Sequence, residues 1–294
     1  MSNQLSRAYS KELSIRMTHV ECSSLCNEIV IRHDNDPVAA HNLCRSIGAG
    51  LLLQPFLEKE ERLSLKWDYK GTLKQILVEV KQDGGVRGLV RPHQLNDSAK
   101  TEEELFGKSC QITAIRLFRD KILQSGITES IMRDPVEDLG YYYSYSEQIE
   151  TSLAVSVGFS QNPEQPIQLC QGILLQAMPG CDLLQFENIR KRLLDPDVKK
   201  ALAKAPKIDN FFEKVLIQIL DPTHKKTDLE IISCPAPSAY CTCTKEKIST
   251  IVKSLPTEDQ EDIIEKGEAL IIRCQFCSKT YEVTIDECKG IWAK

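Results

Sequence analysis

Two close pairs of cysteines near the C-terminus are the residues of this sequence best suited to chemistry. The first pair is Cys241-Thr-Cys243 and the second is Cys274-Gln-Phe-Cys277. Two thiolates at such a spacing supply two ligands to one metal ion, and two pairs complete a four-sulfur tetrahedron, which suits Zn²⁺. Because no histidine lies near either pair, we expect an all-sulfur site with one zinc ion per chain. The alternatives are a purely structural zinc site or a set of unpaired thiols.

The whole chain has an acidic balance, with a net charge of -5. This charge disfavours a nucleic-acid protein held by phosphate contacts, which requires a basic surface. No apolar run approaches the length of a membrane span, and the N-terminal residues lack the basic and apolar pattern of a signal peptide. We therefore expect a cytoplasmic protein that binds neither nucleic acid nor membrane. In that compartment the 12 cysteines are expected to be metal-bound, redox-active or buried, and not bridged.

The first part of the chain, residues 1–181, has the pattern of an α+β domain. Asp36-Pro37 predicts a helix start, with a capping aspartate and a proline in the first turn. Alternation of apolar and polar residues predicts strands at 63–69, 76–80 and 153–159, and further strands are expected at 86–90, 110–118 and 167–177. The segment Asp83-Gly84-Gly85 predicts a hairpin turn, and the strand at 167–177 is expected to be the last of the domain. Strands mixed with helices, without regular βαβ alternation, indicate the α+β class.

The pattern changes after Cys181. Residues 182–232 are expected to form a helical linker, with helices at 182–194 and 211–220 and breaks at Pro196 and Pro206. We expect little apolar surface there, so that the linker could dock on a neighbour but could hardly fold alone. Residues 233–294 form the cysteine-bearing tail, with a predicted helix at 245–254, an acidic turn at 258–262 and a strand at 269–273. About sixty residues build little core, so the metal should supply much of the tail's stability.

Several other residues have weaker claims to chemistry. Cys22 and Cys26 lie four residues apart with His19 nearby, and could form a second metal site. Most such cysteines are small buried residues without a ligand. His41 is expected to be structural or exposed. The tyrosines within residues 138–148 could line a ligand surface, but such residues more often cover the edge of a core with their hydroxyls in water.

The two cysteine segments, together with other parts of the chain, resemble a known family. Tyr240-Cys-Thr-Cys-Thr-Lys-Glu-Lys247 and Arg273-Cys-Gln-Phe-Cys-Ser-Lys-Thr-Tyr281 resemble the tail of the bacterial 33 kDa chaperonins, which are redox-regulated heat-shock holdases. Three more segments agree in the same order: Gly85-Val-Arg-Gly-Leu-Val90, Ser146-Glu-Gln148, and Gly172-Ile-Leu-Leu-Gln-Ala-Met-Pro-Gly180. The resemblance extends over nearly the whole chain.

The resemblance implies a substrate-binding domain, a helical linker and a zinc domain. It implies that Cys241, Cys243, Cys274 and Cys277 hold Zn²⁺ in the reduced, inactive protein. It also implies that oxidation forms the disulfides Cys241–Cys243 and Cys274–Cys277, releases zinc, and unfolds the tail and the linker. The surface exposed in this way would bind unfolded client proteins without ATP, and the active form would dimerise. Cys234 and Cys288 could join other disulfides.

Two functions other than that of a chaperone use similar cysteine pairs. A thiol–disulfide oxidoreductase using Cys274 and Cys277 would need a thioredoxin-like setting with the pair at a helix start, which the tail lacks. A zinc-ribbon nucleic-acid binder is disfavoured by the acidic charge. No nucleophile elbow, P-loop or paired-carboxylate pattern is present. We therefore expect no enzyme, but a stress-response chaperone that prevents the aggregation of unfolded proteins.

Overall fold

The computed structural model describes residues 3–95, 99–204, 206, 210–220 and 229–293 of the 294-residue chain. Contacts within the chain divide it into two compact units, residues 1–239 and residues 240–294. The structure mixes sheets and helices in both units, which confirms the predicted class. Among the helices described, none has the length and apolar character needed to cross a membrane.

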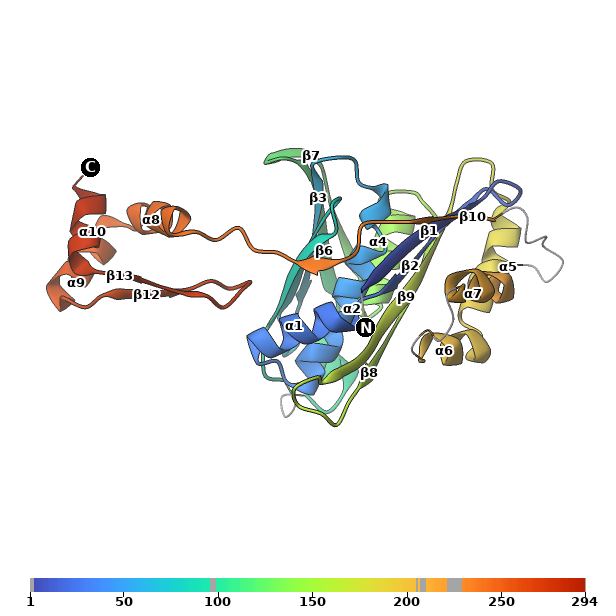
Figure 1. The fold of residues 1–294 in the computed structure, drawn as a ribbon, viewed down its shortest axis with the longest axis horizontal. Helices are drawn as coiled ribbons and strands as arrows, with labels where there is room; N and C mark the ends of the chain where they lie inside the picture. Colours follow the sequence, from blue (N-terminus) through green and yellow to red (C-terminus); the bar gives the residue numbers. More distant parts are fainter. Residues whose placement is uncertain (1–2, 96–98, 205, 207–209, 221–228, 294) are drawn as a thin grey trace. The chain divides into compact units, whose positions relative to one another are not determined.

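One sheet of the first unit has five antiparallel strands in the order β10-β1-β2-β9-β8 (Figure 1). Its strands are β1 (Gln4–Ser10), β2 (Ile15–Glu21), β8 (Thr151–Phe159), β9 (Ile167–Ala177) and β10 (Leu229–Ser233). Strands β8 and β9 confirm two predicted segments. The expectation that β9 is the last strand is wrong, because β10 returns after the linker and pairs with β1, with Ser233 opposite Ser6.

The second sheet has six strands in the order β11-β5-β4-β3-β6-β7. Its strands are β3 (Glu61–Tyr69), β4 (Gln75–Lys81), β5 (Gly85–Arg91), β6 (Cys110–Phe118), β7 (Lys121–Ser130) and β11 (Ser238–Ala239). The predicted strands β3 to β6 and the hairpin turn are confirmed; Gly84 in that turn has a φ of 91°, which glycine adopts without strain. Strand β11 runs parallel to β5, so residues up to Ala239 belong to the first unit.

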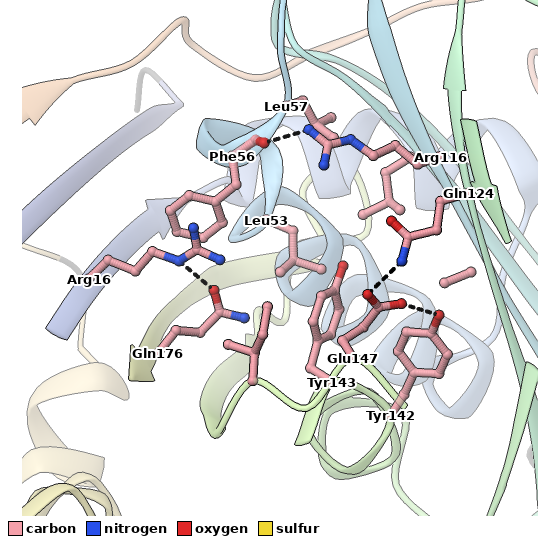
Figure 2. A pocket seen from close by; sticks show the side chains of 13 residues that line it. Arg16, Leu53, Phe56, Leu57, Arg116, Gln124, Tyr142, Tyr143, Glu147 and Gln176 are labelled. Atoms are coloured by element: carbon pink, nitrogen blue, oxygen red, sulfur yellow. Dashed lines mark hydrogen bonds between the residues drawn. The ribbon is translucent and has the colours of Figure 1, made fainter. Parts of the chain in front are cut away.

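A layer of helices lies between the two sheets (Figure 1). Its members are α1 (Ser23–His33), α2 (Pro37–Leu51), the 3₁₀ turn η1 (Gln54–Phe56) and α4 (Pro135–Tyr145), while the short α3 (Glu102–Phe106) contacts the end of β3. The predicted start of α2 is confirmed, because the Ala39 N–H donates to Asp36 Oδ1 at 2.8 Å. The tyrosine cluster lies on α4: Tyr142 is buried and Tyr145 is exposed. A cavity of about 140 Å³ opens beside this helix (Figure 2).

The linker helices cover the outer face of the first sheet (Figure 1). They are α5 (Leu183–Leu193), α6 (Pro196–Leu202) and α7 (Phe211–Ile219). The expectation of little apolar surface is wrong. The helices bury apolar side chains against β1, β2 and β9, namely Phe186, Ile189, Leu193, Val198, Leu202, Phe212, Val215, Leu216 and Ile219. Full burial of one such side chain contributes about 1.5–3 kcal/mol, so the linker helices are held by the sheet rather than by their own propensity.

The second unit is a hairpin with three helices. Its elements are α8 (Lys245–Lys253), α9 (Thr257–Lys266), β12 (Leu270–Arg273), β13 (Thr280–Val283) and α10 (Ile285–Trp292). The predicted helix and strand are confirmed as α8 and β12. The predicted acidic turn is wrong, because residues 258–262 lie inside α9. Glu258 and Asp259 occupy its first turn, where carboxylates complement the helix dipole, and Gly267 ends the helix with a φ of 68°.

Candidate metal centre

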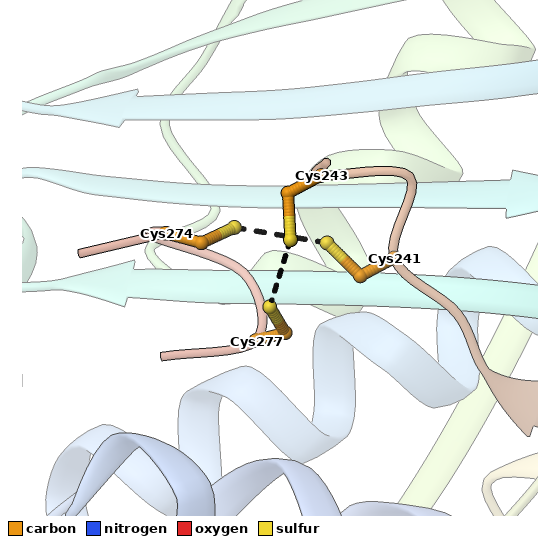
Figure 3. A group of neighbouring side chains, drawn as sticks. All are labelled: Cys241, Cys243, Cys274 and Cys277. Atoms are coloured by element: carbon orange, nitrogen blue, oxygen red, sulfur yellow. Dashed lines mark hydrogen bonds between the residues drawn. The ribbon is translucent and has the colours of Figure 1, made fainter. Parts of the chain in front are cut away.

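The four predicted ligand sulfurs come together in the second unit. The Sγ atoms of Cys241, Cys243, Cys274 and Cys277 all lie within 4.8 Å of one another (Figure 3). Two contacts join one pair to the other: the sulfurs of Cys241 and Cys274 are 3.6 Å apart, and those of Cys243 and Cys277 are 3.2 Å apart. Four sulfurs bound about 2.3 Å from one zinc ion lie about 3.8 Å apart, so the donor set fits a tetrahedral Zn²⁺. A metal ion of this class could be held here.

The hairpin and the start of α8 position these sulfurs. Cys274 directly follows β12, and its N–H donates to the carbonyl oxygen of Lys279 at 2.9 Å, which closes the turn that carries Cys277. On the other side, Cys243 is followed by Thr244, whose hydroxyl accepts from the Lys247 N–H and begins α8. Each half of the cluster is therefore fixed by a local structure that the sequence specifies.

The neighbours of the sulfurs favour one thiolate in the metal-free cluster. The Tyr281 hydroxyl donates to Cys243 Sγ at 3.1 Å and also to the Cys243 carbonyl at 3.0 Å. Although desolvation opposes it, the hydrogen bonds from Tyr281 and the other thiols lower the pKa of Cys243 to about 7. Desolvation and the proton shared with Cys243 raise the pKa of Cys277 to about 12. Binding of a metal ion would release the remaining protons, which makes affinity dependent on pH.

Little besides the cluster holds this unit together. Its buried apolar residues are few: Ile248, Val252, Tyr281, Val283 and Cys288. The Trp292 indole N–H donates to the Val252 carbonyl at 2.9 Å and ties α10 to α8. A core of this size is too small to offset the conformational entropy of some fifty ordered residues, by the usual scaling of small domains. A metal bound to the four sulfurs would therefore stabilise the fold directly.

A polar contact inside the first unit joins the linker to the sheet. Gln171 on β9 is fully buried, and its Nε2 donates to the carbonyl oxygens of Leu202 at 2.9 Å and Lys204 at 2.8 Å. Its Oε1 lies 3.1 Å from His19 Nε2 on β2. The His19 ring stacks on Phe212 of α7 at a centroid distance of 5.3 Å, and burial lowers the pKa of His19 to about 4. Sequence reasoning missed this contact, because it gave no strand at β2.

Comparison with known proteins decides the family. The model of the family described as Hsp33 protein matches residues 3–284. This chain belongs to the Hsp33 family. The 33 kDa chaperonins of Geobacillus sp. (strain WCH70) and Clostridium botulinum (strain Langeland) are each 29% identical to it, over 293 and 294 residues, and in both cases 98% of this chain and 96% of the relative are covered. The Hsp33 homologue of Thermotoga maritima, a 33 kDa chaperonin of known crystal structure, shares the fold with a TM-score of 0.80 at 20% identity, covering 99% of this chain and 98% of that one. Family membership supports a chaperone function, and the relatives are named as chaperonins rather than as enzymes.

The remaining cysteines of this Hsp33 chain lie elsewhere. Cys22 and Cys26 meet Cys170 of β9 in the core, with the Cys22 sulfur 3.5 Å from Cys170 and 3.9 Å from Cys26. All three are fully buried among apolar residues, where thiols are usually inert packing groups. Cys234 is half-buried and Cys288 is buried. His41 is half-buried and stacks on Phe159 at 6.2 Å.

Proposed function

We propose that this chain is a redox-regulated, ATP-independent holdase that binds unfolded proteins under oxidative stress and prevents their aggregation. The chaperone function follows from the family. The redox control rests on one observation: four thiols from two segments converge in a unit with a very small core. Cys241, Cys243, Cys274 and Cys277 would hold one zinc ion in the reduced protein. The bound ion would keep the four sulfurs as thiolates, the form that oxidants attack.

Oxidation turns these four ligands into two disulfides. The two thiolates of Cys274 and Cys277 give two electrons to hydrogen peroxide. Their sulfurs form one bond, the O–O bond breaks, and two protons from the solvent complete two molecules of water. The same reaction joins Cys241 and Cys243. Neighbouring ligands are already close enough for a disulfide to form with little backbone movement. A disulfide sulfur is a poor metal ligand, so the metal leaves and the second unit loses the interaction that stabilised it.

The client surface would lie beneath the linker. Residues 1–181 would form the substrate-binding part, the helices within 182–232 the linker, and the tail of residues 233–294, whose compact part begins at residue 240, the switch. When α5, α6 and α7 unfold, they uncover the outer face of the first sheet, including Ile15, Met17, Ile173 and Leu175. Contiguous apolar surface of this kind binds unfolded chains without sequence preference. The same surface supports dimerisation of the oxidised protein, and the reduced cytoplasm keeps the switch closed until stress.

The oxidoreductase alternative gains no support from the structure of the second unit. Cys274 follows a strand and Cys277 lies in the turn before β13, so neither thiol is at the helix start that lowers the pKa in thioredoxin-like enzymes.

Metal analysis of matched variants tests the proposal. Reduced wild-type protein should carry one zinc ion, and Cys241→Ser should lower that content. Cys181→Ser is the control, because Cys181 is partly exposed like the cluster cysteines but lies outside the cluster. Suppression of client aggregation by the peroxide-treated wild type, without nucleotide, should accompany zinc loss. A zinc-free reduced protein, or equal loss in both variants, would contradict the proposal.

A further inference from the structure

A cavity of about 140 Å³ lies in the first unit, between the two sheets and beside α4 (Figure 2). One part of its wall is apolar and consists of Leu53, Phe56 and Leu57. The other part carries the guanidinium groups of Arg16 and Arg116, one from each sheet. A cavity of about 150 Å³ holds a molecule of the size of benzene, so this one holds a ligand of about six non-hydrogen atoms.

Hydrogen-bond donors around this cavity are in surplus. Arg16 Nε donates to Gln176 Oε1 at 2.8 Å, and the guanidinium lies over the Phe56 ring at 3.9 Å. Its two Nη atoms donate to no residue that the structure describes. Arg116 Nε donates to Glu61, and its Nη2 donates to the Phe56 carbonyl and pairs with Glu61. Its Nη1 has no acceptor among the described residues.

Tyr143 adds a hydroxyl to these donors. Its ring lines the cavity, and within the described ranges its hydroxyl makes no hydrogen bond. An Arg side chain has five N–H donors and no acceptor, so the unused groups call for an acceptor-rich partner. Desolvation lowers the pKa of Arg16; the nearby charge of Arg116 lowers it further, and Tyr143 opposes the shift. A bound anion would offset the cost of burying this positive charge.

The carboxylates in and beside the cavity wall are already engaged. Glu147 Oε1 accepts from the Tyr142 hydroxyl at 2.8 Å, and Oε2 accepts from Gln124 Nε2 at 2.7 Å. Glu61 pairs with Arg116 at 2.6 Å. The two arginines are therefore balanced by two carboxylates, which disfavours a polyanion such as a phosphate ester. A single carboxylate accepts from the free donors while adding only one negative charge to the cavity. Its planar shape also matches the guanidinium fork.

We propose that this cavity binds a small monocarboxylate with a short apolar body. The carboxylate accepts from the Nη groups of Arg16 and from the Tyr143 hydroxyl, and the body packs against Leu53, Phe56 and Leu57. The site belongs to the first unit, whereas the four cysteines belong to the second, and it stands independently of the redox proposal. It gives this chaperone a binding site for a class of small metabolite.

Calorimetry on the reduced, full-length protein tests the site with a matched pair of probes. Butyrate has the predicted size, and butyramide has the same shape without the charge. We expect butyrate to bind with a dissociation constant of about 1 mM or below, within the usual limit for so few atoms. Butyramide should bind at least about tenfold more weakly, because a hydrogen bond to a charged group is lost.

Variants locate the binding. Tyr143→Phe removes only the hydroxyl and should weaken butyrate binding about tenfold, whereas Tyr141→Phe, two positions away in the same helix and outside the cavity wall, should leave it unchanged. Arg16→Gln should abolish binding. Equal affinity for butyrate and butyramide, no binding of either, tighter binding of inorganic phosphate than of butyrate, or wild-type affinity in Tyr143→Phe would each overturn the assignment.

Discussion

Replacement of Gln171 by leucine should open the linker in the reduced protein. The change removes the donor to the carbonyls of Leu202 and Lys204, at 2.9 and 2.8 Å, and the partner of His19 at 3.1 Å. A buried polar group that loses its partner costs about 1–3 kcal/mol. Some of these groups reach water once the linker moves, so we take about 3 kcal/mol in total. At 1.4 kcal/mol for each tenfold, the open population of the linker rises roughly a hundredfold.

Hydrogen exchange of α6 and α7 measures this opening. By the same conversion, their amides should exchange roughly a hundredfold faster in the reduced Gln171→Leu protein than in the wild type. This variant should still bind zinc, and it should already bind some client protein. Gln176→Leu is the matched control: Gln176 lies on the same strand and is fully buried, but it bonds Arg16 and Thr151 and not the linker. Unchanged exchange in Gln171→Leu, or equal acceleration in both variants, would refute the reasoning.

Three further predictions concern His19 in the linker contact and the four-cysteine cluster. Burial lowers the pKa of His19 to about 4, below its ordinary 6.5. The docked linker is therefore fully stabilised by the neutral ring above pH 6.5, and this contribution, about 3 kcal/mol, is lost as the pH falls towards 4. The pH dependence of hydrogen exchange in the linker should flatten in His19→Gln, and an unchanged slope would contradict this. Tyr281→Phe removes the hydrogen bond to Cys243 Sγ and should lower zinc affinity about tenfold in a chelator competition; unchanged affinity would show that the hydroxyl does not support the site. The disulfide Cys274–Cys277 should form before Cys241–Cys243, because the longer spacer closes a less strained ring. Thiol mapping by mass spectrometry during peroxide treatment measures the order, and finding Cys241–Cys243 bridged first would disprove it.

Most of the strands that were predicted from the sequence have two faces that differ in burial, and β9 is the exception. Strand β3 alternates buried and half-buried side chains along its whole length, so its period was visible. Strand β2 was missed because its alternation of apolar and polar residues is short and breaks at His19-Val20, where the strand is buried on both faces. Strand β7 was missed for the opposite reason, since most of its side chains are exposed.

The candidate site, too, could be predicted only in part from the sequence. The four cysteines could be found because each pair is local and its spacing carries the chemistry. The contact between His19 and Gln171 joins residues 152 positions apart, on strands of which one was not predicted, so no local pattern could reveal it. The apolar face of the linker was underestimated, because its short helices contribute only two to four buried side chains each.

The most direct test of the account measures zinc content and holdase activity on the same sample, before and after oxidation by peroxide. The account predicts one zinc ion and little activity in the reduced protein, then loss of zinc together with suppression of client aggregation without ATP, and return of both properties to the starting values after reduction with added zinc. Full activity with zinc retained, or complete loss of zinc without gain of activity, would contradict it.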